Sequence, residues 1–257
     1  MPGPPPKLPT LREDWERALC VAAHPDDLEY GAASAVARWT AQGKQVTYLL
    51  ATRGEAGIDG LDPADCGPLR EREEVAGAAE VGVSVVDFLD YRDGVVEYSL
   101  ALRKDIARAV RKYQPQVVLT GGFDVTMIGG VLNQADHRAV GLATVDAARD
   151  AGNRWVFPEL ADEGLQPWGG VRYILVGGSD RPSHGVDVSE YLPRGIASLQ
   201  AHKAYMDGLG DGSFDVTGFL TWIASASAER LDVEDCDAAV LFETYSLQPE
   251  GPMPWEQ

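Results

Sequence analysis

The chain has 257 residues, of which 45 % are hydrophobic, and a formal net charge of −18. Its length and apolar fraction suit one large α/β domain with a sizeable core. The negative charge argues against nucleic acid or an anionic membrane as partner, because both need Lys and Arg to neutralise phosphates. Three widely spaced cysteines without a CxxC pair indicate neither a disulfide framework nor a thiolate metal site.

The first ten residues contain five prolines, so we expect residues 1–10 to be a disordered lead-in and 11–257 to form a single domain. This opening lacks a basic region followed by an apolar stretch, and nowhere do about eighteen apolar residues run together. The sequence therefore predicts a cytoplasmic protein with no membrane partner. It leaves a homo-oligomer open.

Short apolar runs then alternate with longer Ala-rich amphipathic segments, which is typical of βαβ units around a parallel sheet. The strands that we expect cover residues 18–23, 46–52, 85–89, 116–122, 171–178 and 184–189. The helices that we expect cover residues 33–43, 69–82, 100–113, 137–152, 191–206 and 238–247. These assignments predict an α/β fold.

The first four expected strands each end in a polar cluster, at residues 24–29, 52–57, 90–94 and 120–124, the last followed by 131–137. Ligands of open parallel sheets bind beyond the carboxyl ends of the strands, so these clusters are predicted to share one rim. A glycine-rich segment at 54–68 follows the second strand, and long loops of this kind often form binding walls. We expect it to be the substrate-side wall of the site.

The stretch HPDDLE after the first strand suggests half of a metal site. His24 and Asp27 can present an imidazole nitrogen and a carboxylate oxygen to one point, a donor pair that suits Zn²⁺ or another divalent first-row ion. His137 is the best candidate for a third ligand. Asp26 is next to Asp27 and could act as general base on a water held there, whereas Glu29 is either catalytic or a favourable charge at a helix start.

The sequence contains the motifs AHPDDLE, TRGE, Arg70 with Glu73, the string at 115–120 and DHRAV at 136–140. On these motifs the sequence resembles the PIG-L or LmbE-like family of metal-dependent N-acetylglucosaminyl deacetylases. The resemblance covers residues 17–152. It implies a Rossmann-like three-layer fold with a mostly parallel central sheet. It also implies a zinc-dependent hydrolase that removes an acyl group, usually acetyl, from the amide nitrogen of a GlcNAc-type sugar conjugate.

The resemblance also implies roles for individual residues. His24, Asp27 and His137 match the metal ligands and Asp26 matches the general base. Asp136 matches a carboxylate that orients a neighbouring group. The positions that match sugar contacts or shape the sugar pocket are Glu55, Arg70 and Asp93.

One position departs from the family pattern, because many relatives have a histidine where this chain has Gln134. A glutamine can donate a hydrogen bond to an oxyanion but cannot deliver a proton near neutral pH. Three interpretations follow: Asp26 returns the proton, His184 or His202 substitutes, or activity is lost. His184 is preferred, since it lies at a loop-to-strand junction, and His202 is assigned to the substrate pocket.

The function predicted is therefore hydrolysis of an N-acetyl sugar at a Zn²⁺ site, with Fe²⁺, Co²⁺ or Ni²⁺ left open. One alternative is an amidase for a non-sugar or thiol-conjugate amide. Another is a metal- or sugar-binding homologue that has lost catalysis, which the replacement at Gln134 motivates.

Overall fold

The computed structural model describes residues 6–209 and 214–248, and its centre is a seven-stranded sheet in the order β3-β2-β1-β4-β5-β7-β6. The first five strands in this order run parallel, and β7 runs antiparallel to both β5 and β6. Their bounds are β1 (Arg17–Ala22), β2 (Gln45–Leu50), β3 (Val85–Phe88), β4 (Val117–Gly121), β5 (Tyr173–Gly177), β6 (His184–Asp187) and β7 (Ala239–Ser246). The predicted α/β fold with a mostly parallel sheet is confirmed.

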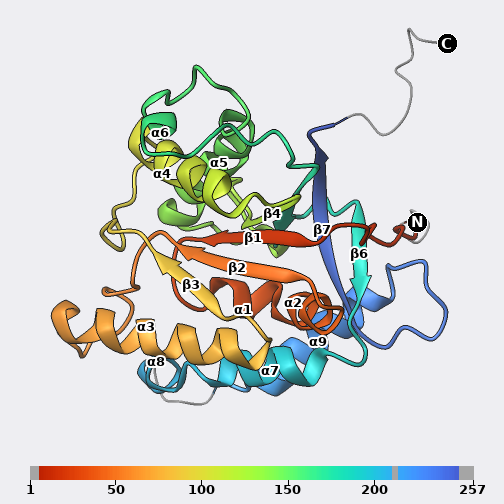
Figure 1. Cartoon of the computed structure of the whole chain (residues 1–257). Coiled ribbons are helices and arrows are strands. Elements are labelled where there is room, and N and C mark those ends of the chain that lie inside the picture. The colour runs from red at the N-terminus through yellow and green to blue at the C-terminus, as the bar shows by residue number, and fades with distance from the viewer. Residues whose placement is uncertain (1–5, 210–213, 249–257) are drawn as a thin grey trace, which may run out of the picture.

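Helices cover both faces of this sheet, which gives the three layers seen in Figure 1. One face carries α1 (Asp27–Gly31), α2 (Ala33–Ala41), α3 (Pro63–Glu80), α7 (Leu192–Gln200), α8 (Lys203–Gly208) and α9 (Val216–Ala228). The other carries α4 (Leu100–Tyr113), α5 (Ala135–Asp150) and α6 (Glu159–Asp162), while a 3-10 turn, η1, spans Ile128–Gly130. No helix in the described residues has the length and apolar character needed to cross a membrane.

Alternation along β1 explains why this strand is central. Cys20 and its even-numbered neighbours face the α2 layer, where Trp39 packs, and Val21 and its odd-numbered neighbours face α4 and α5. A strand buried on both faces reads as a continuous apolar run, as 18–23 does. The parallel register aligns Ala22 with Leu50, so the residues after β1, β2, β3 and β4 come together beyond the carboxyl ends of the strands.

The last predicted helix is wrong, because residues 239–246 form strand β7. This strand lies between β5 and β6, and Phe242 pairs with residues of both and stacks on Trp39. Its state is thus decided by partners far away in the sequence. The predicted helix at 191–206 is instead two helices, α7 and α8, with a break at His202, and α9 was not predicted.

Two further expectations need correction. Residues 6–10 are not a free lead-in, since Leu8 forms a bridge with Leu231 and Thr10 with Gly185, whereas residues 1–5 lie outside the described part. The segment 54–68 is only partly a loop. Its second half is the first turns of α3, which Asp62 caps by accepting the amide of Ala64 at 2.9 Å.

Candidate active site

The HPDD turn directly after β1 forms one half of the site. Asp27 Oδ2 accepts the backbone amides of Ala23 and His24 at 3.0 and 2.9 Å, which folds the turn back on the strand end. Asp26 has a left-handed backbone, with φ 96° and ψ −24°, a conformation that non-glycine residues rarely adopt. The turn therefore aims two adjacent carboxylates in different directions.

The first turn of α5 completes a cluster of three potential ligands. His137 Nε2 lies 3.0 Å from Asp27 Oδ1 and 3.3 Å from His24 Nδ1, and His24 Nδ1 lies 3.7 Å from Asp27 Oδ2. One donor atom from each residue falls within 4.8 Å of the others. Two imidazole nitrogens and one carboxylate, with no fourth ligand in this group among the described residues, form a donor set of the catalytic zinc type.

Hydrogen bonds at the far side of each ring indicate which nitrogen is free to bind a cation. His24 Nε2 lies 3.0 Å from Asp93 Oδ1 and 3.3 Å from Asp136 Oδ2, so a neutral His24 ring carries its proton on Nε2 and leaves Nδ1 bare. His137 Nδ1 lies 3.1 Å from Asn133 Oδ1, an acceptor only, so its Nε2 is the bare nitrogen. Both lone pairs thus point at Asp27, an arrangement that is repulsive without a positive charge between them.

The pKa shifts of the cluster show the same demand for positive charge. Burial lowers the pKa of His24, but the Asp27 charge and carboxylate hydrogen bonds outweigh burial and raise that pKa to about 12. Burial raises the pKa of Asp27, but the two histidines outweigh it and hold that pKa well below its usual range. A divalent ion fits these residues because it supplies the charge that they attract.

Asp136 and Asp93 tie the loop after β3 to this cluster. Asp136, which is 2 % exposed, accepts the amides of Gly94 and Val96 at 2.7 and 3.0 Å. These contacts hold the Asp136 carboxyl beside His24 Nε2, and its orienting role stays a prediction. Glu55 Oε1 accepts the Asp93 amide at 2.9 Å, so the loops after β2 and β3 are held together beside His24.

The predicted base, Asp26, faces α3. Arg70 Nη2 lies 3.1 Å from Asp26 Oδ2, Arg70 also donates to the Pro25 carbonyl, and the Tyr205 ring stacks 3.9 Å from the Arg70 guanidinium. Burial raises the pKa of Asp26 to about 7, and the Arg70 charge opposes part of this rise. Because Arg70 is only 2 % exposed, the structure places it as a partner of Asp26 rather than on an open sugar surface.

His202 lies in a second, closed cluster behind Asp26. Its Nε2 is 3.7 Å from Glu74 Oε2 and 4.0 Å from Glu29 Oε2, and all three side chains are fully buried. Burial lowers the pKa of His202 to about 3, so the ring is neutral. A substrate contact by His202 does not agree with this burial. Glu29, whose role the sequence left open, belongs to the same cluster.

The structure does not bring His184 to the metal-ligand cluster, which consists of His24, Asp27 and His137. His184 begins β6 at the edge of the sheet, where its Nδ1 lies 3.0 Å from Ser183 Oγ. Three strands separate β6 from β1, and a spacing of about 4.8 Å per strand leaves about 19 Å between them, too far for proton delivery. Gln134 is nearer: it is the exposed N-cap residue of α5, one turn before His137.

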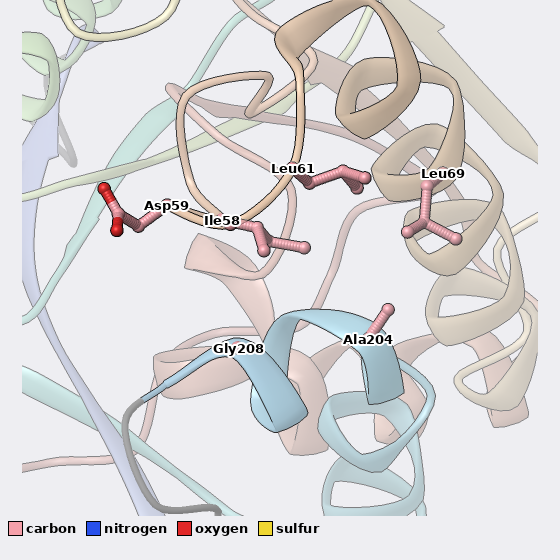
Figure 2. A pocket seen from close by; sticks show the side chains of 7 residues that line it. Ile58, Asp59, Leu61, Leu69, Ala204 and Gly208 are labelled. Carbon is pink, nitrogen blue, oxygen red and sulfur yellow. The ribbon is translucent and has the colours of Figure 1, made fainter.

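The loop after β2 lines a cavity of about 650 Å³ on the α3 and α8 side (Figure 2). Its walls are Ile58, Asp59, Gly60, Leu61, Leu69, Ala204 and Gly208. Gly57, just before this wall, packs so closely on the Arg70 guanidinium that a Cβ there would lie 2.2 Å from Nη1. The cavity is therefore adjacent to the residues that hold Asp26, and a wall role for this loop stays a prediction.

Sequence reasoning missed three residues that contact the site: Asn133, Glu74 and Tyr205. Asn133 donates to the carbonyls of Gly122 and Asp124 at 2.8 and 3.0 Å, which fixes its amide so that Oδ1 faces His137. Glu74 offered one signal, since it lies four residues after Arg70 on the same helix face. Tyr205 offered none, because the break at His202 brings its helix to the site.

A mostly parallel sheet with three potential metal ligands beyond the carboxyl ends of its strands is the arrangement expected of a metal-dependent hydrolase. The family model PIG-L, GlcNAc-PI de-N-acetylase, matches residues 19–148, about half of the chain, and this chain belongs to that family. Membership confirms the family predicted from AHPDD and DH. It also confirms the predicted class of enzyme, a hydrolytic N-deacetylase.

Individual relatives agree with this assignment. Diacetylchitobiose deacetylase of Thermococcus kodakarensis is 28 % identical over 193 residues, 74 % of this chain and 70 % of the relative. The 1D-myo-inositol 2-acetamido-2-deoxy-alpha-D-glucopyranoside deacetylase of Streptomyces scabiei is 32 % identical over a 276-residue alignment, 92 % of this chain and 81 % of the relative. The solved N,N'-diacetylchitobiose deacetylase from Pyrococcus horikoshii shares the fold with a TM-score of 0.81 at 24 % identity, covering 91 % and 85 % of the two chains.

Proposed function

We propose that this protein removes the acetyl group from the amide nitrogen of a GlcNAc-type sugar or small sugar conjugate. The observation that carries the proposal is the convergence of His24, Asp27 and His137 on one point beside the buried carboxyl of Asp26. The relatives named above as deacetylases of acetamido sugars support the substrate class.

The donor set fits Zn²⁺ or another divalent first-row ion held by His24 Nδ1, His137 Nε2 and Asp27. Such an ion, when bound, polarises the amide carbonyl and lowers the pKa of water from about 15.7 toward about 7. In the neutral rings, the side chains behind the ligands hold the proton on the far nitrogen, which leaves the site-side nitrogen free to bind the ion. We assign zinc as the working choice, because nitrogen and carboxylate ligands without thiolate suit it.

Asp26 is assigned to both proton transfers. Its carboxylate takes a proton from the attacking water, and its pKa near 7 suits that task because a base is most effective when its pKa is close to the working pH. Gln134 can donate a hydrogen bond to the tetrahedral oxyanion but holds no proton to transfer. Asp26 then returns its proton to the departing amine, and free acetate and a free amino sugar result.

Acetate release from a panel of N-acetyl sugars tests this proposal. We expect Asp26→Asn to abolish turnover, a loss of at least about 100-fold, while metal content stays at the wild-type level, because Asp26 is not a ligand. Asp146→Asn is the matched control, since its carboxylate accepts a hydrogen bond from the exposed Tyr98 hydroxyl at 2.6 Å, away from the site. Retained turnover in Asp26→Asn would exclude Asp26 as the base.

The same panel separates the alternatives. Release from non-sugar or thiol-conjugate amides but from no N-acetyl sugar would indicate an amidase of different specificity. The exposed Gln134, in place of a proton donor, is the observation that favours a binding homologue. One bound metal per chain with no release from any amide would support that interpretation. A cytoplasmic location stays a prediction, with which the three free cysteines agree.

A further inference from the structure

Helix α3 contacts Asp26 at two points, and only one of them is accounted for by the ion pair described above. Arg70 lies 3.1 Å from the Asp26 carboxylate, while Glu74 Oε2 accepts the Asp26 backbone amide at 3.1 Å. Arg70 and Glu74 are four residues apart, so they project from the same face of the helix, one turn from each other. One helix face therefore holds both the side chain and the backbone of this residue.

The backbone of Asp26 needs such support. Its φ of 96° is in the left-handed region, which is disfavoured for a residue with a Cβ and persists only where neighbours impose it. Its carbonyl already accepts the amides of Glu29 and Tyr30 at 2.9 and 3.1 Å as α1 begins. Its amide has no partner within the turn, so the buried N–H depends on Glu74.

Glu74 occupies a position that costs free energy. Its side chain is fully buried, its Oε1 has no hydrogen-bond partner in the part of the chain that the structure describes, and it shares a closed space with Glu29 and His202. His202 Nε2 lies 3.7 Å from Glu74 Oε2 and 4.0 Å from Glu29 Oε2, and both distances are too long for a direct hydrogen bond. Gly77 lets His202 approach, since a Cβ there would lie 3.0 Å from its Nε2. An apolar side chain would fill this space more cheaply, so the contact with Asp26 is what the carboxylate provides.

We propose that Glu74 is a positioning residue, which with Arg70 forms a clamp from α3 that fixes the Asp26 carboxyl in its reactive orientation. The catalytic part of this inference rests on the proposed function, whereas the clamp itself does not. Loss of the backbone contact lets the turn relax toward ordinary φ values, and displacement of a catalytic group by about 1 Å can cost about 100-fold in rate.

Two substitutions of similar volume separate the acceptor from the rest of the side chain. Glu74→Gln keeps an oxygen that can accept the Asp26 amide, whereas Glu74→Met does not. We expect Glu74→Met to lower kcat by about 10- to 100-fold with KM within about twofold, and Glu74→Gln to keep kcat within about threefold. Hydrogen exchange of the 21–31 peptide should speed up about tenfold in Glu74→Met only, because one hydrogen bond is lost.

Asp150→Asn is the control for a buried carboxylate, since Asp150 is 9 % exposed and pairs with Arg103 at 2.7 Å on the other face of the sheet. It should lower the Tm without changing kcat or the rate of hydrogen exchange in residues 21–31.

Exchange is measured on the full chain with metal present, so the clamp is tested even if no sugar is deacetylated. Unchanged exchange in Glu74→Met would overturn the proposal, as would equal damage by both substitutions. Two metal ions per wild-type chain, with one lost in Glu74→Gln, would overturn it in favour of a buried cation site.

Discussion

Two opposing effects act on the pKa of Asp26, and their balance sets the pH range in which its carboxylate can accept a proton. Burial raises the pKa of its carboxyl to about 7, and the Arg70 guanidinium 3.1 Å away lowers it relative to burial alone. A base works only when deprotonated, so activity falls as the pH drops through this pKa. Any cation bound at the neighbouring cluster would move the acid limb further down.

Arg70→Met should therefore shift the acid limb of kcat/KM upward by roughly one to two pH units, because an adjacent opposite charge is lost. Activity would be most reduced near pH 6 and partly recovered near pH 9. A pH profile of acetate release measures the shift, with thermal melting to verify that the variant is folded. A uniform loss at every pH would contradict this electrostatic role for Arg70.

The grouping of His24, Asp27 and His137 could be predicted at this scale, because these residues occur in short strings whose spacing carries the chemistry. The role of Asp26 as the base stays a prediction. The contact of Glu74 with Asp26 could not be predicted. Its spacing from Arg70 places both residues on one face of α3, but this face meets Asp26 only when the helix packs behind the turn. The roles expected for His184, as a proton donor, and for His202, as a substrate contact, were harder still to assign. His184 and His202 are both histidines near polar segments, yet one lies at a sheet edge and the other is fully buried.

At the scale of elements, α7 packs closely against α2 and also contacts α3 and α1, the short helix that follows the HPDD turn. Gly195 of α7 packs against α2 so tightly that a Cβ would lie 2.1 Å from Ser34 Oγ and 2.9 Å from the Ser34 amide. A neighbouring side chain can rotate, but the backbone cannot move without shifting α2 against α7.

We expect Gly195→Ala to lower the free energy of unfolding by about 1–3 kcal/mol, as overpacking of cores does. For a chain of this size, each kcal/mol corresponds to roughly 2–4 °C in Tm. Gly169→Ala is the control, because Gly169 has ordinary φ and nothing within 4 Å of its Cβ position. Thermal unfolding checks both, and equal Tm values for the two variants would show that the α2–α7 approach tolerates a methyl group.

Elements with a local signal were predicted well, and those decided by distant partners were not. The expected helix at 100–113 is α4 residue for residue, with Ser99 as its N-cap and an amphipathic pattern that needs no partner to be recognised. Residues 239–246, AVLFETYS, instead form a short run with few polar side chains at its start, and such a run suits either a helix or a strand. Pairing with β5 and β6 decides for a strand.

At the scale of the whole molecule, the metal-ligand cluster joins segments that are far apart in the chain. His24 and Asp27 follow β1, His137 lies on α5 after β4, and Asp93 comes from the loop after β3. The unfolded chain separates these groups by up to 113 residues, so it cannot offer the same site. A cation that binds there binds the folded chain and not the unfolded chain. Its free energy of binding therefore adds to the free energy of unfolding.

Removal of the metal should therefore lower the Tm as well as the activity. At a free metal concentration about 100-fold above the dissociation constant, binding adds about 2.7 kcal/mol, which corresponds to roughly 5–11 °C for a chain of this size. Calorimetry before and after treatment with a chelator, with metal content measured in parallel, checks the shift, and added Zn²⁺ should reverse it. His137→Ala is the decisive comparison, because a chain without this ligand should melt at one temperature with or without the chelator. A chelator effect of equal size in His137→Ala would mean that the stabilising ion sits elsewhere, and the cluster would lose its assignment.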